Sequence, residues 1–269
     1  MFTYLNPKVR KKLISEGKLI KITASGKVLN EHSHNQGERV INILGPIPLP
    51  LSLNGNHYQC DWYAAVRSTE LEKVQNLADS MRDSGRQNLF STMVSPMAVN
   101  SILVIGNGLK SENPLIRVHS NCLTGDVFGS QRCECGPQFA SALDRISNDP
   151  QGGIIIYMTG HEGRGIGLWA KAATYLLQDA GENTYQANES LGLPADSRDF
   201  SDAASLIYHF IGNKTFRILT NNPKKIEDLE KAGLSKMTIE KHVTGVTKWN
   251  KQYLRAKRDW GHSIGESDI

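Results

Sequence analysis

The sequence predicts an α/β protein in which a layered mixed sheet is flanked by helices. From residue 115 onward, short apolar runs alternate with helical patterns, which is typical of a layered domain with a mixed or mostly parallel sheet. The run Gly153–Met158 (GIIIYM) has the β-branched composition of a buried strand. Residues 1–114 contain strands, loops and one helix. We therefore expect a less regular N-terminal region of undefined role over 1–114 and a second, more regular domain over 115–269.

The elements of the N-terminal region follow from apolar patterning and from turn residues. Three prolines in the segment GPIPLPL should end the strand that precedes it. Thr69-x-x-Glu72 has the form of a capping box, and the apolar residues behind it share one face of a helix that Gly85 ends. The expected strands are Arg39–Leu44, His57–Val66 and Met97–Ile105.

The second domain is expected to alternate strands with helices. Pro137 and Pro223 each stand where a helix can begin, since proline is favoured in the first helical turn. Ser201 is an expected helix cap. The expected strands are Leu115–His119, Gly153–Met158 and Thr215–Leu219. The expected helices are Pro137–Ser147, the segment that ends at Gly181, Asp202–Ile211, Pro223–Ala232 and Lys248–Asp259.

Composition indicates a globular protein of a reducing compartment. Hydrophobic residues make up 39% of the chain and charged residues 22%, and no run of about 18 apolar residues could cross a membrane. The N-terminus has basic residues but no apolar core of the signal-peptide type. The net charge of +4 is too small to indicate nucleic-acid binding. We expect a cytoplasmic protein with no membrane or nucleic-acid partner.

Three of the four cysteines, Cys122, Cys133 and Cys135, stand close together at the spacing C-x10-C-x-C. In a chain without a secretory signal, such a group indicates a metal site rather than disulfides. Thiolates suit zinc, and three protein ligands leave a fourth position for water, which favours a catalytic zinc. The alternative is a structural zinc knuckle whose fourth ligand is a histidine or Cys60.

Two turns between a strand and a helix are candidates for phosphate binding. The glycine-rich turn Gly160–Gly165 precedes a helix, where backbone amides favour anions, and Arg164 adds a bidentate donor. The segment Leu219–Lys225 (LTNNPKK) repeats this layout and offers Thr220 and Lys225. A plain capped helix with exposed lysines is the alternative for this second segment.

The segment 117–139 (RVHSNCLTGDVFGSQRCECGPQF) resembles the zinc-binding segment of the GTP cyclohydrolase II family, which opens the guanine ring of GTP at the start of riboflavin synthesis. The resemblance continues through HEGRGIGL, YLLQDAG, LPADSRDF and LTNNPKKIEDLEKAG, and weakly at YLRAKRDWGH. It covers about residues 115–262. It implies a GTP cyclohydrolase II-like catalytic domain over 115–269, one Zn²⁺ per chain, Mg²⁺ with the nucleotide phosphates, and a homodimer.

The resemblance also implies a role for each residue of the site. It implies that zinc binds Cys122, Cys133 and Cys135, that the catalytic residues are Asp196, Arg198 and Tyr175, and that the nucleotide contacts Arg117, Val118, His119, Ser120, Asn121, Gln138, Glu162, Gly163, Arg164, Thr184, Thr220 and Lys225. Zinc-bound hydroxide attacks C8 of the imidazole ring, formate is released, and pyrophosphate leaves the α-phosphate.

The three catalytic residues also have plainer interpretations. Tyr175, which the resemblance places by the zinc-bound water, could equally serve core packing. Asp196 and Arg198 could form an exposed ion pair worth about 0–1 kcal/mol. The resemblance makes Arg198 the nucleophile on the α-phosphate and Asp196 its proton acceptor. Because a guanidinium stays protonated, stabilisation of a departing pyrophosphate is a second role for Arg198.

Departures from the family pattern leave the base open. The chain has Gly160-His161 where the pattern has an Arg-Gln pair, and Asn121 before its first site cysteine. The segment Thr184–Ser190 is expected to border the base, and its Gln186 offers an amide that can donate to and accept from uracil. A carboxylate such as Glu162 or Glu189 would instead suit guanine. The alternatives to GTP are therefore a uracil nucleotide (UMP or UTP) in pyrimidine catabolism, or a non-catalytic nucleotide-binding module.

Overall fold

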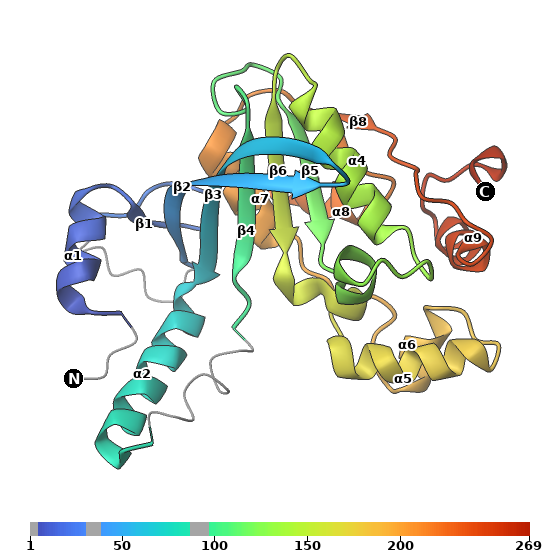
Figure 1. Ribbon diagram of the computed structural model, residues 1–269, viewed down its shortest axis with the longest axis horizontal. Coiled ribbons are helices and arrows are strands. Elements are labelled where there is room, and N and C mark those ends of the chain that lie inside the picture. The colour runs from blue at the N-terminus through green and yellow to red at the C-terminus, as the bar shows by residue number, and fades with distance from the viewer. Residues whose placement is uncertain (1–4, 31–38, 87–96) are drawn as a thin grey trace.

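The computed structural model describes residues 5–30, 39–86 and 97–269 (Figure 1). One mixed sheet of eight strands, in the order β1-β2-β3-β4-β6-β5-β7-β8, forms its centre. The strands are β1 (Leu19–Ile22), β2 (Ile41–Leu53), β3 (Asn56–Arg67), β4 (Asn100–Ile105), β5 (Leu115–Ser120), β6 (Gly153–Met158), β7 (Phe216–Leu219) and β8 (Met237–Glu240). The predicted mixed α/β fold is confirmed.

The N-terminal part of the sheet is antiparallel. Strands β1 to β4 pair in chain order, and β2 and β3 join through a tight turn at Asn54 and Gly55, both with positive φ as such hairpin turns require. The expectation that the prolines end β2 is wrong. The strand continues past them with a register shift between Leu44 and Ile47, and its outer half pairs only with β3. Prolines are tolerated there because an edge strand leaves one row of N–H positions without a partner.

The C-terminal part of the sheet is parallel. Strand β6 pairs antiparallel with β4 on one side and parallel with β5 on the other, and β5, β7 and β8 continue in parallel. The sheet therefore runs without interruption across residue 114, and the division of the chain into two domains at that residue stays a prediction. The carboxyl ends of β5, β6 and β7 lie at the same edge of the sheet.

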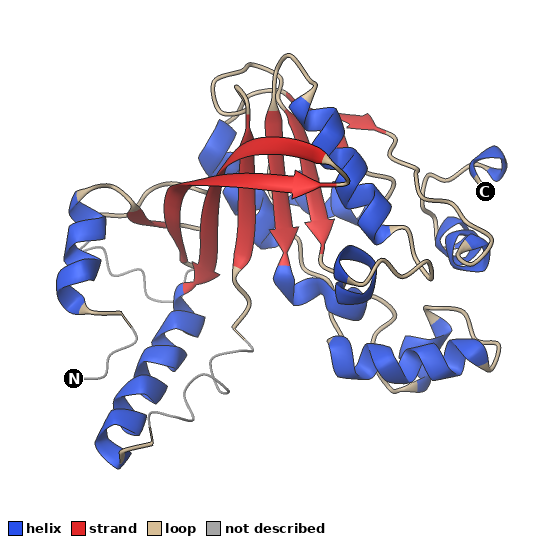
Figure 2. Cartoon of the chain, viewed as in Figure 1, coloured by secondary structure: helices blue, strands red, loops and turns tan. Residues whose placement is uncertain are grey.

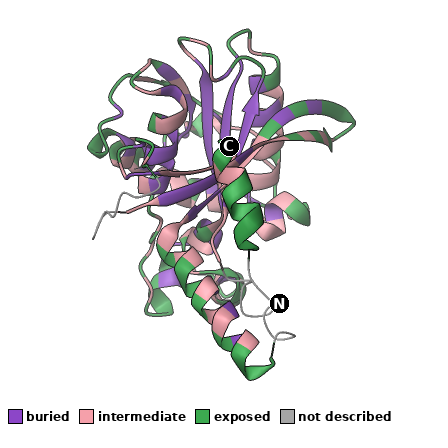
Figure 3. Ribbon diagram, turned by 90° about the vertical axis from the view of Figure 1, so that its left-hand side faces the viewer, coloured by how far each residue is buried: buried purple, intermediate pink, exposed green. Residues whose placement is uncertain are grey.

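Helices cover both faces of the sheet (Figure 2). One face packs on α7 (Ser201–Ile211) and α8 (Pro223–Lys231) through residues such as Ile116, Ile156 and Phe200. The other packs on α4 (Cys135–Ser147), and the curled end of the β2–β3 hairpin joins this second cluster. The central strands are buried along their length, whereas the hairpin tip is exposed (Figure 3). The remaining helices are α1 (Pro7–Ser15), α2 (Ser68–Ser84), α5 (Leu168–Asp179), α6 (Gln186–Ser190) and α9 (Lys251–Asp259).

Helix starts differ from the expectation at two places. Helix α2 begins at Ser68, directly after β3, and its N-cap Arg67 makes no side-chain capping bond, so the expected capping box at Thr69 is wrong. Ser201 is likewise the first helical residue rather than the cap. Segments α6, β1 and β8 were not expected as regular elements. Among the described residues, no helix combines the length and the apolar character needed to span a membrane.

Candidate metal and nucleotide site

The candidate site is a pocket at the carboxyl ends of the parallel strands, the place where open α/β sheets bind ligands. Asn121 and Cys122 follow β5, the turn Thr159–Arg164 follows β6, and Thr220 follows β7. All but Thr159 and Gly160 of these residues line the pocket. The strand order thus brings together three chain segments that lie far apart in the sequence.

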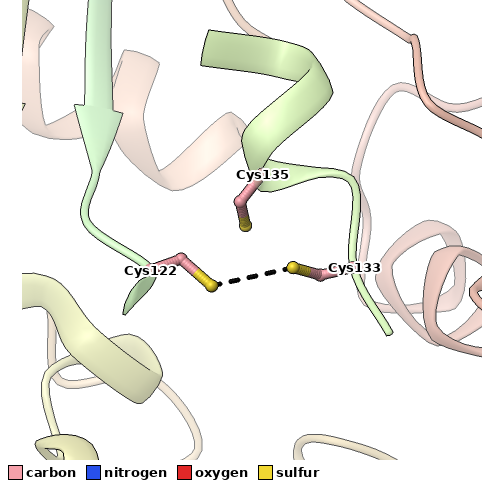
Figure 4. A group of neighbouring side chains, drawn as sticks. All are labelled: Cys122, Cys133 and Cys135. Carbon is pink, nitrogen blue, oxygen red and sulfur yellow. Dashed lines mark hydrogen bonds between the residues drawn. The ribbon is translucent and has the colours of Figure 1, made fainter. Parts of the chain in front are cut away.

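The three predicted metal ligands form one cluster (Figure 4). Their sulfur atoms lie within 4.8 Å of one another, and the Sγ atoms of Cys122 and Cys133 are 3.6 Å apart. A tetrahedral zinc with bonds of about 2.3 Å needs sulfur atoms about 3.8 Å apart, so the cluster fits that ion. Cys60 is buried in β3 with the core residues around α4 and does not belong to the cluster.

A turn of the chain closes tightly over the thiols. A Cβ atom at Gly125 would lie 2.9 Å from the Sγ of Cys133 and 3.2 Å from that of Cys122, so a larger residue there would displace the ligands. The carboxylate of Asp126 accepts hydrogen bonds from the Cys122 N–H at 3.0 Å and from the Tyr157 hydroxyl at 2.8 Å. Backbone and side chain together hold the first ligand in place.

Charge is distributed unevenly among the three thiols. Hydrogen bonds from Cys133 and then Cys135 lower the pKa of Cys122, and they outweigh burial, which raises it. The same hydrogen bond to Cys122 raises the pKa of Cys133, and hydrogen bonds with both partners raise the pKa of Cys135. These contacts favour the deprotonated form most at Cys122.

A buried lysine lies against the sulfur of Cys122. The Nζ of Lys171 is 3.2 Å from the Cys122 Sγ, 3.0 Å from the Thr124 Oγ1 and 2.5 Å from the Glu162 Oε1. Burial lowers the pKa of Lys171, but the hydrogen bond to Glu162 and the charge of Cys122 raise it further, so the net shift is upward. The hydroxyl of Tyr175 lies 3.0 Å from the same Thr124 Oγ1, which places it beside the cluster.

Another part of the pocket wall, the cationic end, holds several buried cations. Arg117 donates to the Leu219 carbonyl and to the Gln138 Oε1, both at 2.8 Å. Lys225, at the start of α8, donates to the Val118 carbonyl at 2.6 Å. Burial lowers the pKa of Arg117 to about 10. Burial, then the charges of Arg117 and Arg198, lower the pKa of Lys225 well below its usual range. An anionic ligand would relieve this repulsion.

Arg198 forms a bidentate ion pair with Asp196. Its Nε and Nη2 donate to the two oxygens of Asp196 at 2.9 and 2.6 Å, and the two side chains are only 13% and 10% exposed. The pair is thus largely buried, so the plain interpretation of an exposed ion pair is wrong. Burial raises the pKa of Asp196, but the hydrogen bonds and charge of Arg198 outweigh it and lower the pKa overall.

His161 connects this arginine to the backbone. Its Nε2 lies 3.1 Å from the Asp199 carbonyl, which can only accept, so Nε2 carries the proton and Nδ1 accepts from the Ser120 hydroxyl at 3.1 Å. The Ser120 Oγ in turn accepts from the Arg198 Nη1 at 3.4 Å. Burial, and then the charge of Arg198, lower the pKa of His161 to about 4. The imidazole is therefore neutral at pH 7.

Arg164 lies on the wall of the pocket near α6. Its guanidinium carbon is 4.2 Å from the centre of the Tyr185 ring and 5.5 Å from that of Tyr253. Its Nη1 donates to the Thr184 Oγ1 at 2.5 Å. This stacking between two aromatic rings fixes Arg164 on the pocket wall.

Most residues that the sequence singles out meet in this pocket. It is lined by Arg117, His119, Ser120, Asn121, Gln138, Glu162, Gly163, Arg164, Thr184, Thr220, Lys225, Tyr175 and Arg198, together with the three site cysteines. Val118 contributes its carbonyl to Lys225, and Asp196 lies behind Arg198. Their individual roles stay predictions.

Gln186 and Glu189 do not line the pocket. Both are exposed, and the Gln186 Oε1 accepts from the Asn183 N–H. The sequence predicts Gln186 beside the base because the segment Thr184–Ser190 follows the helix that contains Tyr175. The short helix α6 turns the intervening side chains in different directions, so Thr184 and Asn188 line the pocket instead.

Several pocket residues carry no sequence motif of their own. Lys171 lies one helical turn before Tyr175, and that spacing could have revealed it. Glu134 lies between two of the ligands and pairs with Lys257 of α9. Four buried polar atoms of lining residues have no hydrogen-bond partner among the described residues, as a pocket for a polar ligand would show. They are the Arg117 Nε, the His119 Nδ1, the Glu134 Oε2 and the His262 Nδ1.

Fold and site together define an α/β protein in which a three-cysteine cluster that could hold a metal ion lines the same pocket as several buried cations. The chain belongs to the GTP cyclohydrolase II family, whose sequence model matches residues 88–241, more than half of its length. It is similar to the riboflavin biosynthesis protein RibBA of Mycobacteroides abscessus, with 49% identity over 155 residues, which cover 57% of this chain and 37% of that protein.

Similar values hold for other relatives. The RibBA protein of Salinispora arenicola is 46% identical over 173 residues, which cover 62% of this chain and 40% of that protein. The chloroplastic monofunctional riboflavin biosynthesis protein RIBA 3 of Arabidopsis thaliana is 46% identical over 159 residues, covering 59% of this chain and 31% of that protein. The chain thus spans less than half of the length of the curated relatives it matches.

Proposed function

We propose that this chain is a zinc-dependent hydrolase that opens the imidazole ring of GTP and releases formate and pyrophosphate in riboflavin biosynthesis. The observation that carries the proposal is the meeting of a three-thiol cluster and a group of buried cations in one pocket. Membership of the GTP cyclohydrolase II family supports the reaction, and the names of the relatives support the pathway.

The thiol end would supply the hydrolytic nucleophile. Zinc held by Cys122, Cys133 and Cys135 would keep a fourth position and lower the pKa of a bound water toward ~7. The Tyr175 hydroxyl, held beside the cluster by Thr124, would orient the reacting ring and give a proton to the departing nitrogen. Burial raises the pKa of Tyr175, so its hydroxyl keeps the proton that this role requires.

The cationic end would hold the triphosphate. Arg117 and Lys225 are buried donors near the start of α8, where backbone amides also favour anions. The two oxygens of Asp196 are both occupied by Arg198, which leaves Asp196 a poor proton acceptor and keeps the guanidinium protonated. We therefore assign Arg198 the stabilisation of charge on the departing pyrophosphate rather than nucleophilic attack. Mg²⁺ bound with the phosphates would share this task.

GTP is the substrate that we propose, because the main argument for uracil does not hold. Gln186, the amide expected to read uracil, lies outside the pocket. A homodimer in the cytoplasm completes the proposal, and small-angle scattering at micromolar concentration tests that assembly. A monomer would contradict it.

The decisive experiment is incubation of the zinc-loaded chain with GTP, UTP and UMP in separate reactions, followed by formate detection and mass analysis of the products. We expect formate and pyrophosphate from GTP, and a kcat/KM for GTP at least about 10⁴-fold above that for either uracil nucleotide, since a pocket built for one base leaves polar groups unpaired with another. No formate from GTP would refute the proposal. A ring-opened product from UTP or UMP alone, seen by mass analysis as the addition of water without formate release, would establish the alternative.

A further inference from the structure

We propose that Lys171 is a positioning residue that sets the electron-donating strength of the metal site through an N–H···S hydrogen bond to Cys122. The proposal rests on the proposed function insofar as it assumes that the three thiols bind a metal ion. The sequence motifs do not single out Lys171, and it makes none of the contacts assigned to the nucleotide.

The geometry leaves the ammonium group no other arrangement. An ammonium has three N–H donors, and Lys171 lies within 3.2 Å of three acceptors: the Cys122 Sγ, the Thr124 Oγ1 and the Glu162 Oε1. The residue is only 7% exposed, which leaves little room for water beside the ammonium group. Each donor therefore has one acceptor, and the sulfur receives one of the three hydrogen bonds.

Glu162 holds the ammonium in this place. One carboxylate oxygen pairs with Lys171 at 2.5 Å, and the other accepts the Leu123 N–H at 2.7 Å. The carboxylate balances the charge of the lysine, so the ammonium does not add a net charge to the site. Its effect on Cys122 is therefore that of a directed hydrogen bond.

A hydrogen bond to a ligand sulfur withdraws electron density from it and so changes the metal that it binds. Three thiolates on a divalent cation give a site with a net charge of about −1, which is a strongly donating environment. Weakening one donor makes the metal a better Lewis acid. Among the described residues, Cys122 is the ligand that receives a hydrogen bond from a charged side chain, so the three thiolates would differ in strength.

Lys171 also connects the cluster to Tyr175. Both residues lie on one face of α5, one helical turn apart, and both contact the Thr124 hydroxyl at 3.0 Å. The same ammonium that contacts the sulfur therefore orients the hydroxyl that holds Tyr175. Loss of Lys171 should change the donor strength of the thiolates and the position of Tyr175 together.

The test uses the full chain with Co²⁺ in place of zinc, because the thiolate-to-cobalt charge-transfer absorption reports the donor strength of the sulfurs directly. In Lys171→Met the sulfur lone pair of Cys122 rises in energy, so we expect this absorption to move to longer wavelength while one Co²⁺ per chain stays bound. Turnover of GTP by the zinc form should fall about 10- to 100-fold. Lys171→Arg keeps an N–H donor and should restore most of the band position.

Two further variants serve as controls. Lys171→Met leaves Glu162 buried without a partner, which can destabilise the fold, so the double variant Lys171→Met/Glu162→Gln removes both charges and should show the same displaced band. The matched control is Lys231→Met, a lysine on the surface of α8 that pairs with Glu227 and should leave the band unchanged.

The outcomes separate this inference from the proposed function. A full Co²⁺ content with an unmoved band in Lys171→Met or in the double variant would overturn it. So would loss of cobalt, or failure to fold, in both variants, because Lys171 would then serve retention of the metal or stability. The cobalt spectrum needs no substrate, so an absence of GTP turnover in the unmodified chain would refute the proposed function without affecting this test.

Discussion

The two ends of the pocket differ in charge: one gathers potential anions and the other gathers cations. At the thiol end, three potential anions crowd together, and Lys171, a buried cation, lies against Cys122. At the other end, Arg117, Lys225 and Arg198 repel one another, and Asp196 neutralises only one of them. Each end thus suits a ligand of the opposite charge, as the proposed metal cation and the proposed triphosphate would be. In such a pre-organised site, like charges repel one another in the free protein, and binding of an oppositely charged ligand reduces this repulsion.

The largest expected effect is the loss of a thiol. Cys133→Ser should lower the metal content well below one per chain and reduce turnover by about 10³-fold or more, because the group that activates water is removed. The measurement is zinc content by elemental analysis together with formate release. Cys60→Ala is the control, since Cys60 lies in the core, and it should keep both metal and activity. Full metal content in Cys133→Ser would refute the hypothesis that three thiolates bind the metal.

At the cationic end, Arg198→Ala should slow pyrophosphate release about 10²- to 10³-fold, the usual cost of removing one donor that stabilises developing charge. Zinc content should be unchanged, because the hydrogen bonds of Arg198 go to Asp196 and Ser120 and not to a site cysteine. Arg198→Lys keeps the charge but not the bidentate pair with Asp196, so we expect partial activity. Pyrophosphate release at the unmodified rate in Arg198→Ala would show that the two ends are not divided as proposed.

His161 allows a finer test of the same end. Glutamine can accept from Ser120 and donate to the Asp199 carbonyl as the neutral imidazole does, so His161→Gln should keep turnover within about 2-fold. His161→Leu removes both bonds and frees the Ser120 hydroxyl from its orientation toward Arg198. We expect kcat to fall about 5-fold, as one neutral hydrogen bond of about 1 kcal/mol implies. Equal turnover in the two variants would mean that the contact through Ser120 does not position Arg198.

The same histidine should affect stability in acid. Because the pKa of His161 is lowered to about 4 in the folded chain, the unfolded chain binds this proton more readily below the usual pKa of about 6.5. The stability that the neutral ring contributes is present above that pH and is lost as the pH falls toward 4. The free energy of unfolding, measured with denaturant, should therefore fall less between pH 7 and pH 4 in His161→Gln than in the unmodified chain. An equal fall in the two proteins would contradict the lowered pKa of His161.

Much of this arrangement was predictable from the sequence. The apolar, β-branched composition of Gly153–Met158 predicts a buried strand, as found. The close spacing of the three cysteines predicts that they form one cluster, as they do. The charge state of the ends was not predictable, because it depends on burial. The Asp196–Arg198 pair reads as an exposed surface pair in the sequence, and only its packing behind the pocket makes it rigid.

The failures have a common physical cause. The prolines of β2 are tolerated because the outer half of that strand has one neighbour, and strand neighbours are a property of the whole sheet. Gln186 was misplaced because a short helix reverses the direction of side chains within a few residues. Lys171 was missed because a lysine on a helix is usually solvated. In each instance the direction or the neighbours of a side chain were set by the folded structure and not by the residue types nearby in the sequence.

The smallest expected effect is a proton taken up when triphosphate binds. Burial and the neighbouring charges lower the pKa of Lys225 well below its usual value of about 10.4, and phosphate oxygens would raise it again. Between the lowered and the restored pKa, binding should therefore take up a fraction of a proton. Calorimetry in buffers of different ionisation enthalpy measures this uptake as a slope in the binding enthalpy. Lys225→Met should reduce the slope, whereas Lys224→Met, a half-exposed neighbour paired with Asp228, should leave it unchanged. A slope that is the same in the unmodified chain and in Lys225→Met would show that the cationic end is not strained by its own charge, and the contrast between the two ends would fail there.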